Sequence, residues 1–373
     1  MKHNYRAYAV VNLKNIYHNV KKIKEKSNNK MVMTVVKADG YGHGAVKVAK
    51  AIYDISDGFL VATIDEAIEL RSALINKPIL ILGTLMEHEY DKAVEYDIIV
   101  PLYTIDMALL LNEEAKKAQK KAKCHLVVDT GMNRIGMNDN DEGIKLCEKI
   151  NNLEFIEIDG IFSHFALSDA KDKTCLNTQM LRFNNFLNKL KDKDINIPHK
   201  HIFNSAAIVD VTCDDYDIVR PGIITYGLSP SDEIDISSLN LKEAMEVKSH
   251  ITYIKTIKDG ETVSYGNTYK AIGERKIATI PVGYADRYPR LLSSVGRVLI
   301  NGSYAPIAGR ICMDQFMVDV TDVDCKIGDE VTLIGRDGDL FISADEVAKH
   351  AMTINYEIIC SFGKRVRRIY IEE

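Results

Sequence analysis

Short apolar runs alternate with amphipathic stretches of helical spacing through the first part of the chain. Most positions within each run are apolar, so both faces of the strand would be buried, which is typical of a parallel sheet covered by helices. Eight strand–helix units over roughly 200 residues predict a (β/α)8 barrel. The runs that we interpret as its strands are 32–36, 59–62, 79–82, 98–102, 124–128, 156–162, 201–203 and 216–219.

Amphipathic stretches lie before the first run and between the later ones. In the stretch that precedes the first strand, Ile16, Val20 and Ile23 fall on one face of a helix. The same spacing predicts helices over 13–26, 45–53, 64–74, 107–120 and 178–190.

The pattern changes near residue 235. Alternating apolar and polar positions, interrupted by turn signals, replace the helical spacing, and this is typical of antiparallel strands. Ser343 followed by Glu346 predicts one late helix that begins with a capping box. The turn signals are 258–260, 301–302 and 336–338, and the predicted strands are 247–257, 276–281, 298–300, 317–320 and 330–334.

We therefore predict an α/β chain with two domains. A chain of 373 residues, of which 46% are hydrophobic, is long enough for two buried cores. The (β/α)8 barrel would cover residues 11–235 and a mainly β domain would cover 236–373. The N-terminal strand, 1–10, would join the second domain.

Charge and cysteine content narrow the class of protein. The formal net charge is −5 and no long basic stripe is present, which argues against nucleic acid as a partner. No apolar stretch approaches the ~20 residues of a membrane span, and the N-terminus lacks a signal-peptide pattern. The seven cysteines are widely spaced without a CxxC pair, which argues against a disulfide framework or a zinc knuckle. We predict a cytoplasmic protein that binds neither membrane nor nucleic acid.

Polar residues follow five of the eight predicted strands, and the active site of such a barrel lies at these strand ends. Lys37 follows the first strand, where the cost of burying an ammonium favours a neutral, nucleophilic amine. The ends of the seventh and eighth strands offer the Ser205 hydroxyl and the N–H groups after Gly222, and a phosphate commonly binds there. A nucleophilic lysine beside a phosphate site predicts pyridoxal 5′-phosphate (PLP) as cofactor. The remaining polar strand ends are 129–134 and 163–165.

Nine motifs between about Tyr5 and Tyr370 resemble, in order, those of alanine racemases, which are PLP enzymes of fold type III. The resemblance implies a barrel followed by a β domain, and a head-to-tail homodimer whose active sites take residues from both subunits. It also implies interconversion of L- and D-alanine, which supplies D-alanine for peptidoglycan. The motifs are VVKADGYGHG, VDTGMNRIG, FSHFA, FNSAA, VRPGIITYG, SYGNTY, PVGYADRYPR, GRICMDQ and TINYE.

The resemblance assigns two catalytic acid–base groups, one for each face of a planar carbanion. Lys37 would form the Schiff base with PLP and act on one face, and Tyr265 of the partner subunit would act on the other. A tyrosine with a free pKa of ~10 needs a polarising neighbour to act as a base, and His164 resembles the family histidine in that role. Arg220 resembles the arginine that contacts the pyridine nitrogen. A guanidinium can only donate, so this nitrogen stays unprotonated, which favours racemisation over transamination.

The remaining site residues divide into a phosphate side and a substrate side. Tyr356 also restricts the space for the substrate side chain, which favours alanine. A serine racemase or a serine/alanine racemase of the same family is the alternative. The resemblance places Tyr41, Asn204, Ser205, Gly222, Ile223 and Tyr356 against the cofactor, and Arg134, Met313 and Tyr284 against the substrate.

Two positions depart from the family pattern. Many members carry a carbamylated lysine that positions the substrate arginine, and here Val127 occupies that place. We therefore predict that no carbamate forms and that Arg134, if buried, needs another acceptor. Arg287 stands where the family motif has glycine, which would alter the entrance to the site.

Other readings of the chain remain open. His199 and His201 form an HxH pair of the kind that binds metal in barrel hydrolases, although few partners are available on other strands. A PLP carrier without activity would share the lysine strand but would lack the β-domain motifs. A decarboxylase of this fold type is disfavoured by Arg220.

Overall fold

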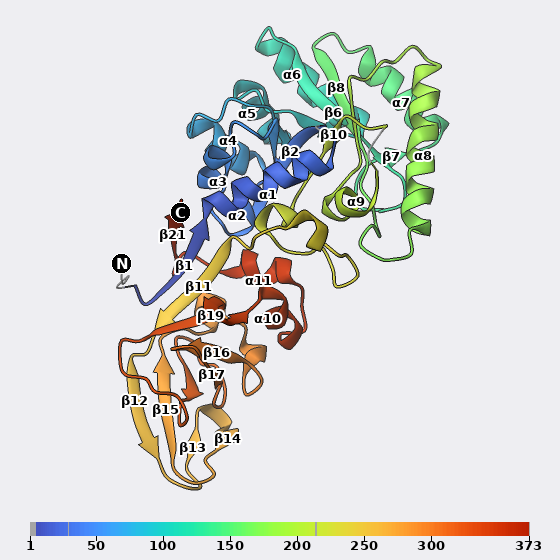
Figure 1. Ribbon diagram of the computed structural model, residues 1–373. Coiled ribbons are helices and arrows are strands. Elements are labelled where there is room, and N and C mark those ends of the chain that lie inside the picture. The colour runs from blue at the N-terminus through green and yellow to red at the C-terminus, as the bar shows by residue number, and fades with distance from the viewer. Residues whose placement is uncertain (1–4, 29, 213–214, 373) are drawn as a thin grey trace. The chain divides into compact units, whose positions relative to one another are not determined.

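The computed structural model describes residues 5–28, 30–212 and 215–372. Two compact units make up the chain, and Figure 1 labels their elements. The first, here called the barrel unit, comprises Asn15–Gly40 and Ala45–Glu243. The second, the β unit, comprises Met1–Lys14, Tyr41–Gly44 and Ala244–Glu373. The predicted domain boundaries, 11–235 and 236–373, stay a prediction.

In the residues that the structure describes, eight parallel strands close the barrel unit, and one further short strand lies beside them. One run of neighbours has the order β10-β2-β3-β4 and the other β5-β6-β8-β9, with the short β7 beside β6. A parallel bridge between Leu80 and Ile99 joins the two runs at one side, and the amide of Asp217 donates to the Lys200 carbonyl at the other. The strands are β2 (Met31–Val35), β3 (Gly58–Val61), β4 (Ile79–Ile81), β5 (Val100–Leu102), β6 (Ala122–Asp129), β7 (Met137–Asn138), β8 (Ile156–Phe162), β9 (His199–His201) and β10 (Ile218–Val219).

The prediction of an α/β barrel followed by a mainly β domain is confirmed. The position of the seventh barrel strand, however, differs from the prediction. The seventh strand was expected at 201–203, but β9 ends at His201, which pairs with Phe162. Ile202 and Phe203 are fully buried beyond the end of the ladder. The apolar run therefore marks burial, whereas the hydrogen bonds mark the strand.

Helices follow the strands of the barrel unit. Threonine or asparagine side chains accept hydrogen bonds from the first turns of four of them, at Thr63, Thr104, Asn140 and Asn204, and such caps fix where a helix begins. The helix predicted at 178–190 begins earlier, at Thr174. The helices are α1 (Leu13–Lys26), α3 (Ala45–Ala51), α4 (Ile64–Ser72), α5 (Tyr90–Glu95), α6 (Ile105–Lys117), α7 (Asp141–Asn151), α8 (Thr174–Lys191) and α9 (Ser205–Asp210).

The described part of the β unit contains a seven-stranded, a three-stranded and a two-stranded sheet. The large sheet has the order β17-β16-β19-β11-β1-β21, with β20 beside β19, and the smaller ones are β12-β15-β18 and β13-β14. Its strands are β1 (Ala7–Asn12), β11 (Met245–His250), β12 (Tyr253–Ile257), β13 (Thr262–Val263), β14 (Tyr269–Lys270), β15 (Arg275–Ile280), β16 (Arg297–Ile300), β17 (Ser303–Pro306), β18 (Phe316–Asp319), β19 (Glu330–Asp337), β20 (Leu340–Ile342) and β21 (Arg367–Ile371).

Two local predictions in the β unit need correction. The strand expected at 247–257 is two strands in different sheets, because the amide of Ile251 donates to Asp329 while that of Thr252 donates to Thr279. Ser343 caps α10 (Ala344–His350) as expected. The carboxylate of Glu346, however, pairs with Arg297 at 2.7 Å and does not complete a capping box.

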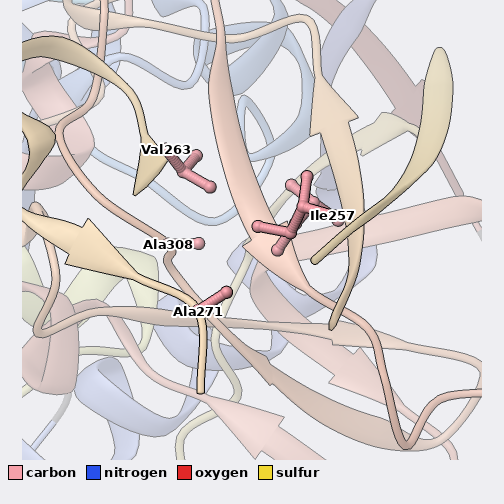
Figure 2. Close-up of a cluster of buried hydrophobic side chains, with 5 residues drawn as sticks. Ile257, Val263, Ala271 and Ala308 are labelled. Atoms are coloured by element: carbon pink, nitrogen blue, oxygen red, sulfur yellow. The ribbon is translucent and has the colours of Figure 1, made fainter. Parts of the chain in front are cut away.

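A small apolar cluster supports the segment that carries Tyr265. It consists of Ile257, Val263, Ala271, Ile277 and Ala308, all buried, and Figure 2 shows how their side chains converge. The cluster fixes β13 and β14 on either side of the turn that holds the predicted base. Among the helices that the structure describes, none is both long and apolar enough to cross a membrane.

Candidate active site

Lys37 lies directly after β2, in a tight turn with unusual backbone geometry. The turn, labelled α2 (Lys37–Tyr41), has positive φ at Ala38 (52°), Asp39 (52°) and Gly40 (62°). Left-handed geometry costs a non-glycine residue roughly 1–2 kcal/mol and persists only where the surroundings impose it.

A carboxylate from α4 holds this turn. Glu66 accepts hydrogen bonds from the amides of Ala38 and Ala62, both at 2.7 Å. The side chain of Asp39 accepts one from the Ala45 amide at 2.8 Å. Glu66 was not expected from the sequence, where it resembles an ordinary first-turn glutamate. These bonds fix the backbone on which Lys37 is carried.

The structure brings Lys37, Arg134, His164 and Arg220 together around one cavity of the barrel unit. The cavity has a volume of about 280 Å³, and Val127, Asp129, Phe162 and Ser163 also line it. The guanidinium groups of Arg134 and Arg220 bring positive charge to a lining whose described residues include one carboxylate, Asp129, so the cavity suits an anionic group.

Burial and the neighbouring cations hold His164 in its neutral form. Desolvation, followed by the charges of Arg220, Arg134 and Lys37, lowers its pKa to about 3. Arg220 approaches its Nδ1 at 3.3 Å, and a guanidinium can only donate. The proton of the neutral ring is therefore on Nε2, which can donate to an oxygen.

The terminal nitrogens of the Arg220 guanidinium form hydrogen bonds within the protein, whereas its Nε does not among the described residues. Its Nη2 donates to the Ser163 carbonyl at 2.8 Å, and its guanidinium lies over the Phe162 ring. Desolvation, with the charge of Arg134, lowers its pKa to about 9, so it is still charged at neutral pH. Among the residues that the structure describes, none accepts from its Nε–H. This donor is left for a group in the cavity.

A chain of buried imidazoles connects Arg220 to a carboxylate. Arg220 Nη1 lies 2.7 Å from His201 Nδ1, His201 Nε2 lies 2.8 Å from His125 Nδ1, and His125 Nε2 lies 3.4 Å from Asp159. Because arginine only donates and a carboxylate only accepts, both neutral histidines carry their proton on Nε2. Both ring nitrogens of His201 therefore have hydrogen-bond partners in this row of side chains. His201, one member of the HxH pair, needs no metal ion to satisfy them.

These buried histidines should make the protein sensitive to acid. Burial lowers the pKa of His125, His164 and His201 below the ordinary value. The unfolded chain therefore binds protons that the folded state excludes, and stability is lost as the pH falls below about 6.5. We expect the free energy of unfolding to fall by on the order of 1 kcal/mol per pH unit for each histidine between pH 6 and 5.

Unfolding of the apoprotein by urea, measured at several pH values, checks this expectation. The free energy of unfolding should change less steeply with pH in His125→Gln than in the wild type. In His88→Gln the slope should stay that of the wild type, because His88 is exposed. A stability that does not change between pH 7 and 5 would contradict it.

A second polar group lies at the ends of β9 and β10. The amide of Gly222 donates to the buried Ser205 hydroxyl at 2.9 Å, so the hydroxyl proton can point elsewhere. Asn204 caps α9 by accepting from the Ala207 amide. A 3-10 helix begins at Ile223, and the first amides of a helix have no partner within it. Asn204 thus acts on the backbone. The Ser205 hydroxyl and the Ile223 amide offer donors for an anion, whereas the Gly222 amide is used to hold the Ser205 oxygen.

The two predicted phosphate-side tyrosines lie together in the β unit. The ring centroids of Tyr41 and Tyr356 are 6.1 Å apart. Gly42 and Gly44 lie next to Tyr41, with φ of 79° and 93°. A Cβ on Gly42 would lie 2.2 Å from the Ile359 carbonyl oxygen, so only glycine allows this approach. Backbone conformation is thus the role of these glycines.

Tyr265 and Met313 line a second cavity, within the β unit. Its volume is about 410 Å³, and Ser264, Cys312 and Asp314 also line it. The side chain of Tyr265 is 70% exposed and that of Met313 is 54% exposed. The amide of Tyr284 donates to the Cys312 carbonyl at 3.1 Å, which brings the third predicted residue to the same loop.

Models of two protein domains match nearly the whole chain. The alanine racemase N-terminal domain matches residues 11–230, and the alanine racemase C-terminal domain matches residues 244–370. The chain belongs to the alanine racemase family.

Individual alanine racemases resemble the chain over its full length. The alanine racemase of Clostridium novyi (strain NT) is 45% identical, with 100% of this chain and 97% of the relative covered. The crystal structure of the alanine racemase from a D-cycloserine-producing Streptomyces lavendulae has a TM-score of 0.95 at 32% identity, covering 100% and 98% of the two chains. An alanine racemase of Clostridium difficile 630, in complex with cycloserine, has a TM-score of 0.92 at 38% identity, covering 100% and 97%.

Both departures from the alanine racemase motifs have structural consequences. Val127 is buried against the cavity. Arg134 is exposed, so the condition under which it was expected to need another acceptor, namely burial, is not met in the described chain. Arg287 has φ of 70°, a conformation that favours glycine. The family glycine is thus replaced at a position where an arginine is strained.

Proposed function

We propose that this chain catalyses the interconversion of L- and D-alanine with PLP as its cofactor. The observation that carries the proposal is the convergence of Lys37, His164 and Arg220 on one cavity in a chain of the alanine racemase family. The amine, the neutral imidazole and the donor-only guanidinium are the groups that racemisation through PLP requires at these places.

The residues present fit PLP. The Nε–H of Arg220 supplies a donor for a ring nitrogen. The Ser205 hydroxyl, whose oxygen is held by the Gly222 amide, and the amide of Ile223 supply donors for a phosphate. Lys37 supplies the amine for covalent attachment. When bound, PLP withdraws electrons from the substrate α-carbon and makes its proton acidic.

Two side chains would exchange the α-proton, one on each face of the substrate. Lys37 Nζ acts on one face, and the phenolic oxygen of Tyr265 acts on the other. The Nε2–H of His164 donates to that oxygen and stabilises the phenolate, which brings the tyrosine closer to the pKa of a useful base. Arg134 and the Met313 amide hold the substrate carboxylate, and Tyr284 closes the entrance.

We further propose a homodimer in which each β unit completes the barrel of its partner. In support, Tyr265, Tyr284 and Met313 are all exposed on the β unit of the described chain. A two-fold axis would let one interface supply both sites. We place the enzyme in the cytoplasm, where the D-alanine it forms would supply peptidoglycan synthesis, and we keep 11–235 and 236–373 as its domains.

Incubation of the holoenzyme with L-alanine in deuterium oxide tests the function. The circular dichroism of alanine should decay to zero, and both enantiomers should carry deuterium at the α-carbon. Deuterium incorporation without loss of optical activity would indicate one-base exchange, and no change at all would favour a PLP carrier without activity.

The same assay should distinguish alanine from serine. Tyr356 is packed near Tyr41 and limits the room for a substrate side chain, but an added hydroxyl is rejected by no more than about a hundredfold in such a pocket. We expect kcat/KM for L-alanine to exceed that for L-serine by about 10- to 100-fold. A preference for L-serine would contradict the role of Tyr356.

A further inference from the structure

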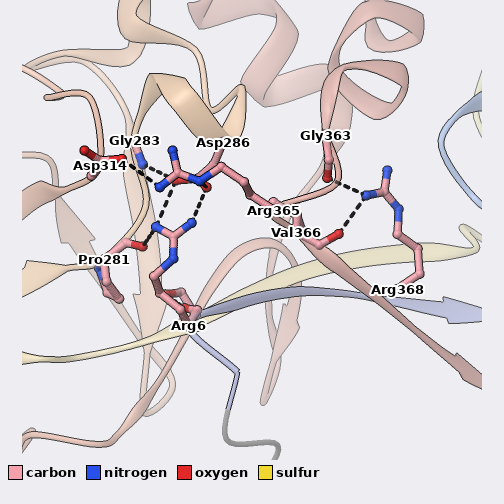
Figure 3. Close-up of polar contacts among 10 residues, drawn as sticks. Arg6, Pro281, Gly283, Asp286, Asp314, Gly363, Arg365, Val366 and Arg368 are labelled. Atoms are coloured by element: carbon pink, nitrogen blue, oxygen red, sulfur yellow. Dashed lines mark hydrogen bonds and ion pairs between the residues drawn. The ribbon is translucent and has the colours of Figure 1, made fainter.

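The turn that carries Tyr284 contains a buried carboxylate held by two arginines. The side chain of Asp286 is fully buried. Its Oδ2 accepts from Arg6 Nη1 at 3.1 Å and from the Gly283 amide at 3.0 Å, and its Oδ1 accepts from Arg6 Nη2. Arg365 Nε lies 3.3 Å from the same Oδ1. Figure 3 shows both guanidinium groups next to this carboxylate.

Arg365 extends this network to the loop that carries Met313. Its Nη2 donates to Asp314 Oδ1 at 2.7 Å, as Figure 3 also shows. The charges alternate from Arg6 through Asp286 and Arg365 to Asp314, so the four groups are neutral together. A buried carboxylate that loses a partner is left uncompensated, which is costly. The network therefore favours one arrangement of its four members.

Backbone contacts join the same two segments. The amide of Ala285 donates to the Met313 carbonyl at 2.9 Å, and that of Tyr284 to Cys312. A Cβ on Gly283 would lie 2.3 Å from the Met313 carbonyl oxygen. Arg287, which ends the turn, keeps its strained left-handed conformation, and such strain persists where the surroundings determine the backbone. The turn and the loop thus behave as one element.

We propose, resting on the function proposed above, that Asp286 and Arg365 are positioning residues for the substrate carboxylate. They hold Tyr284 and the amide of Met313 in the arrangement that one subunit presents to the barrel of its partner. The residues Tyr284 and Met313 are both exposed in the described chain. An arrangement that is fixed before the substrate arrives lowers the cost of binding it.

Tyr265, the proposed proton-transfer group of the β unit, is not a member of the charged network. Tyr265 follows Ser264, whose hydroxyl donates to the Arg310 carbonyl at 2.6 Å and lies 3.5 Å from Cys312 Sγ. Asp314 lines the same cavity as Tyr265, but no hydrogen bond or ion pair joins any of the four charged residues to Tyr265 in the described chain. Loss of the network should therefore weaken substrate binding and leave proton transfer intact. In kinetic terms, KM should rise while kcat is kept.

Arg365→Gln is the sharpest test, because Arg365 is half exposed and its loss leaves Arg6 on the buried Asp286. We expect KM for alanine to rise about fivefold and kcat to stay within about twofold in the holoenzyme. Amide exchange of the segments 283–286 and 312–314 should become faster in the same variant. Arg365→Lys should restore part of both effects. The matched control is Lys364→Gln, which removes the same charge at the exposed neighbouring position.

Unchanged KM and unchanged amide exchange in Arg365→Gln would overturn the proposal. So would a loss of kcat together with a lower melting temperature, because that pattern belongs to a purely structural role. Asp286→Asn should exceed Arg365→Gln in both readouts; if it fails to fold, Asp314→Asn takes its place, with an effect like that of Arg365→Gln. If the wild-type enzyme does not racemise alanine, the proposed function fails, whereas amide exchange still decides whether the network orders the two segments.

Discussion

Replacing Tyr265 with phenylalanine is expected to slow the loss of the α-proton from L-alanine by about a thousandfold. Exchange of the α-proton of D-alanine should slow far less, by about tenfold or less, because Lys37 would still act on that face. Only the phenolic oxygen is removed, and since the side chain is 70% exposed in the described chain, its loss should not disturb folding.

Wash-in of deuterium from solvent, followed separately for each enantiomer, measures this asymmetry. Tyr253→Phe is the matched control, because Tyr253 is another exposed tyrosine of the β unit and lies on β12, away from the cavity that Tyr265 lines. Equal slowing of exchange from both enantiomers would contradict the assignment of one base to each face.

The barrel could be predicted because its strands are buried on both faces. In β2 and β3, apolar residues occupy nearly every position and turn signals bound each run. The strand boundaries that were predicted wrongly depend on which distant segment accepts a hydrogen bond from the strand. The switch of partner at Ile251 and Thr252, and the end of β9 at His201, are set by residues far along the chain. No local pattern carries that information.

In the candidate site, too, some residues could be predicted from the sequence and others could not. Lys37, His164 and Arg220 could be placed because the ends of parallel strands meet at one rim. The residues that hold them in place could not. Glu66 is an unremarkable glutamate in the first turn of a helix, and Asp286 lies within a familiar motif without any sign of its two arginine partners. Pairing across large sequence separations is visible only once the chain is folded.

Two inactive variants combined in one dimer should regain activity. A chain with Lys37→Ala lacks the lysine, and a chain with Tyr265→Phe lacks the second base, so each homodimer should be nearly inactive. If the tyrosine comes from the partner, the mixed dimer has one barrel with Lys37 that faces an intact Tyr265. Co-expression with two different affinity tags and purification on both should yield a mixed dimer with about half the wild-type activity.

A reciprocal dimer provides the matched control. One subunit is wild type and the other carries both Lys37→Ala and Tyr265→Phe. If the tyrosine acts across the interface, each site of this dimer lacks one of the two groups and activity should be nearly absent. If both groups came from the same subunit, this dimer would keep one intact site and the first mixed dimer would keep none. The two arrangements therefore give opposite results from the same four subunits, which decides whether the exposed Tyr265 of the β unit serves the chain that carries it or its partner.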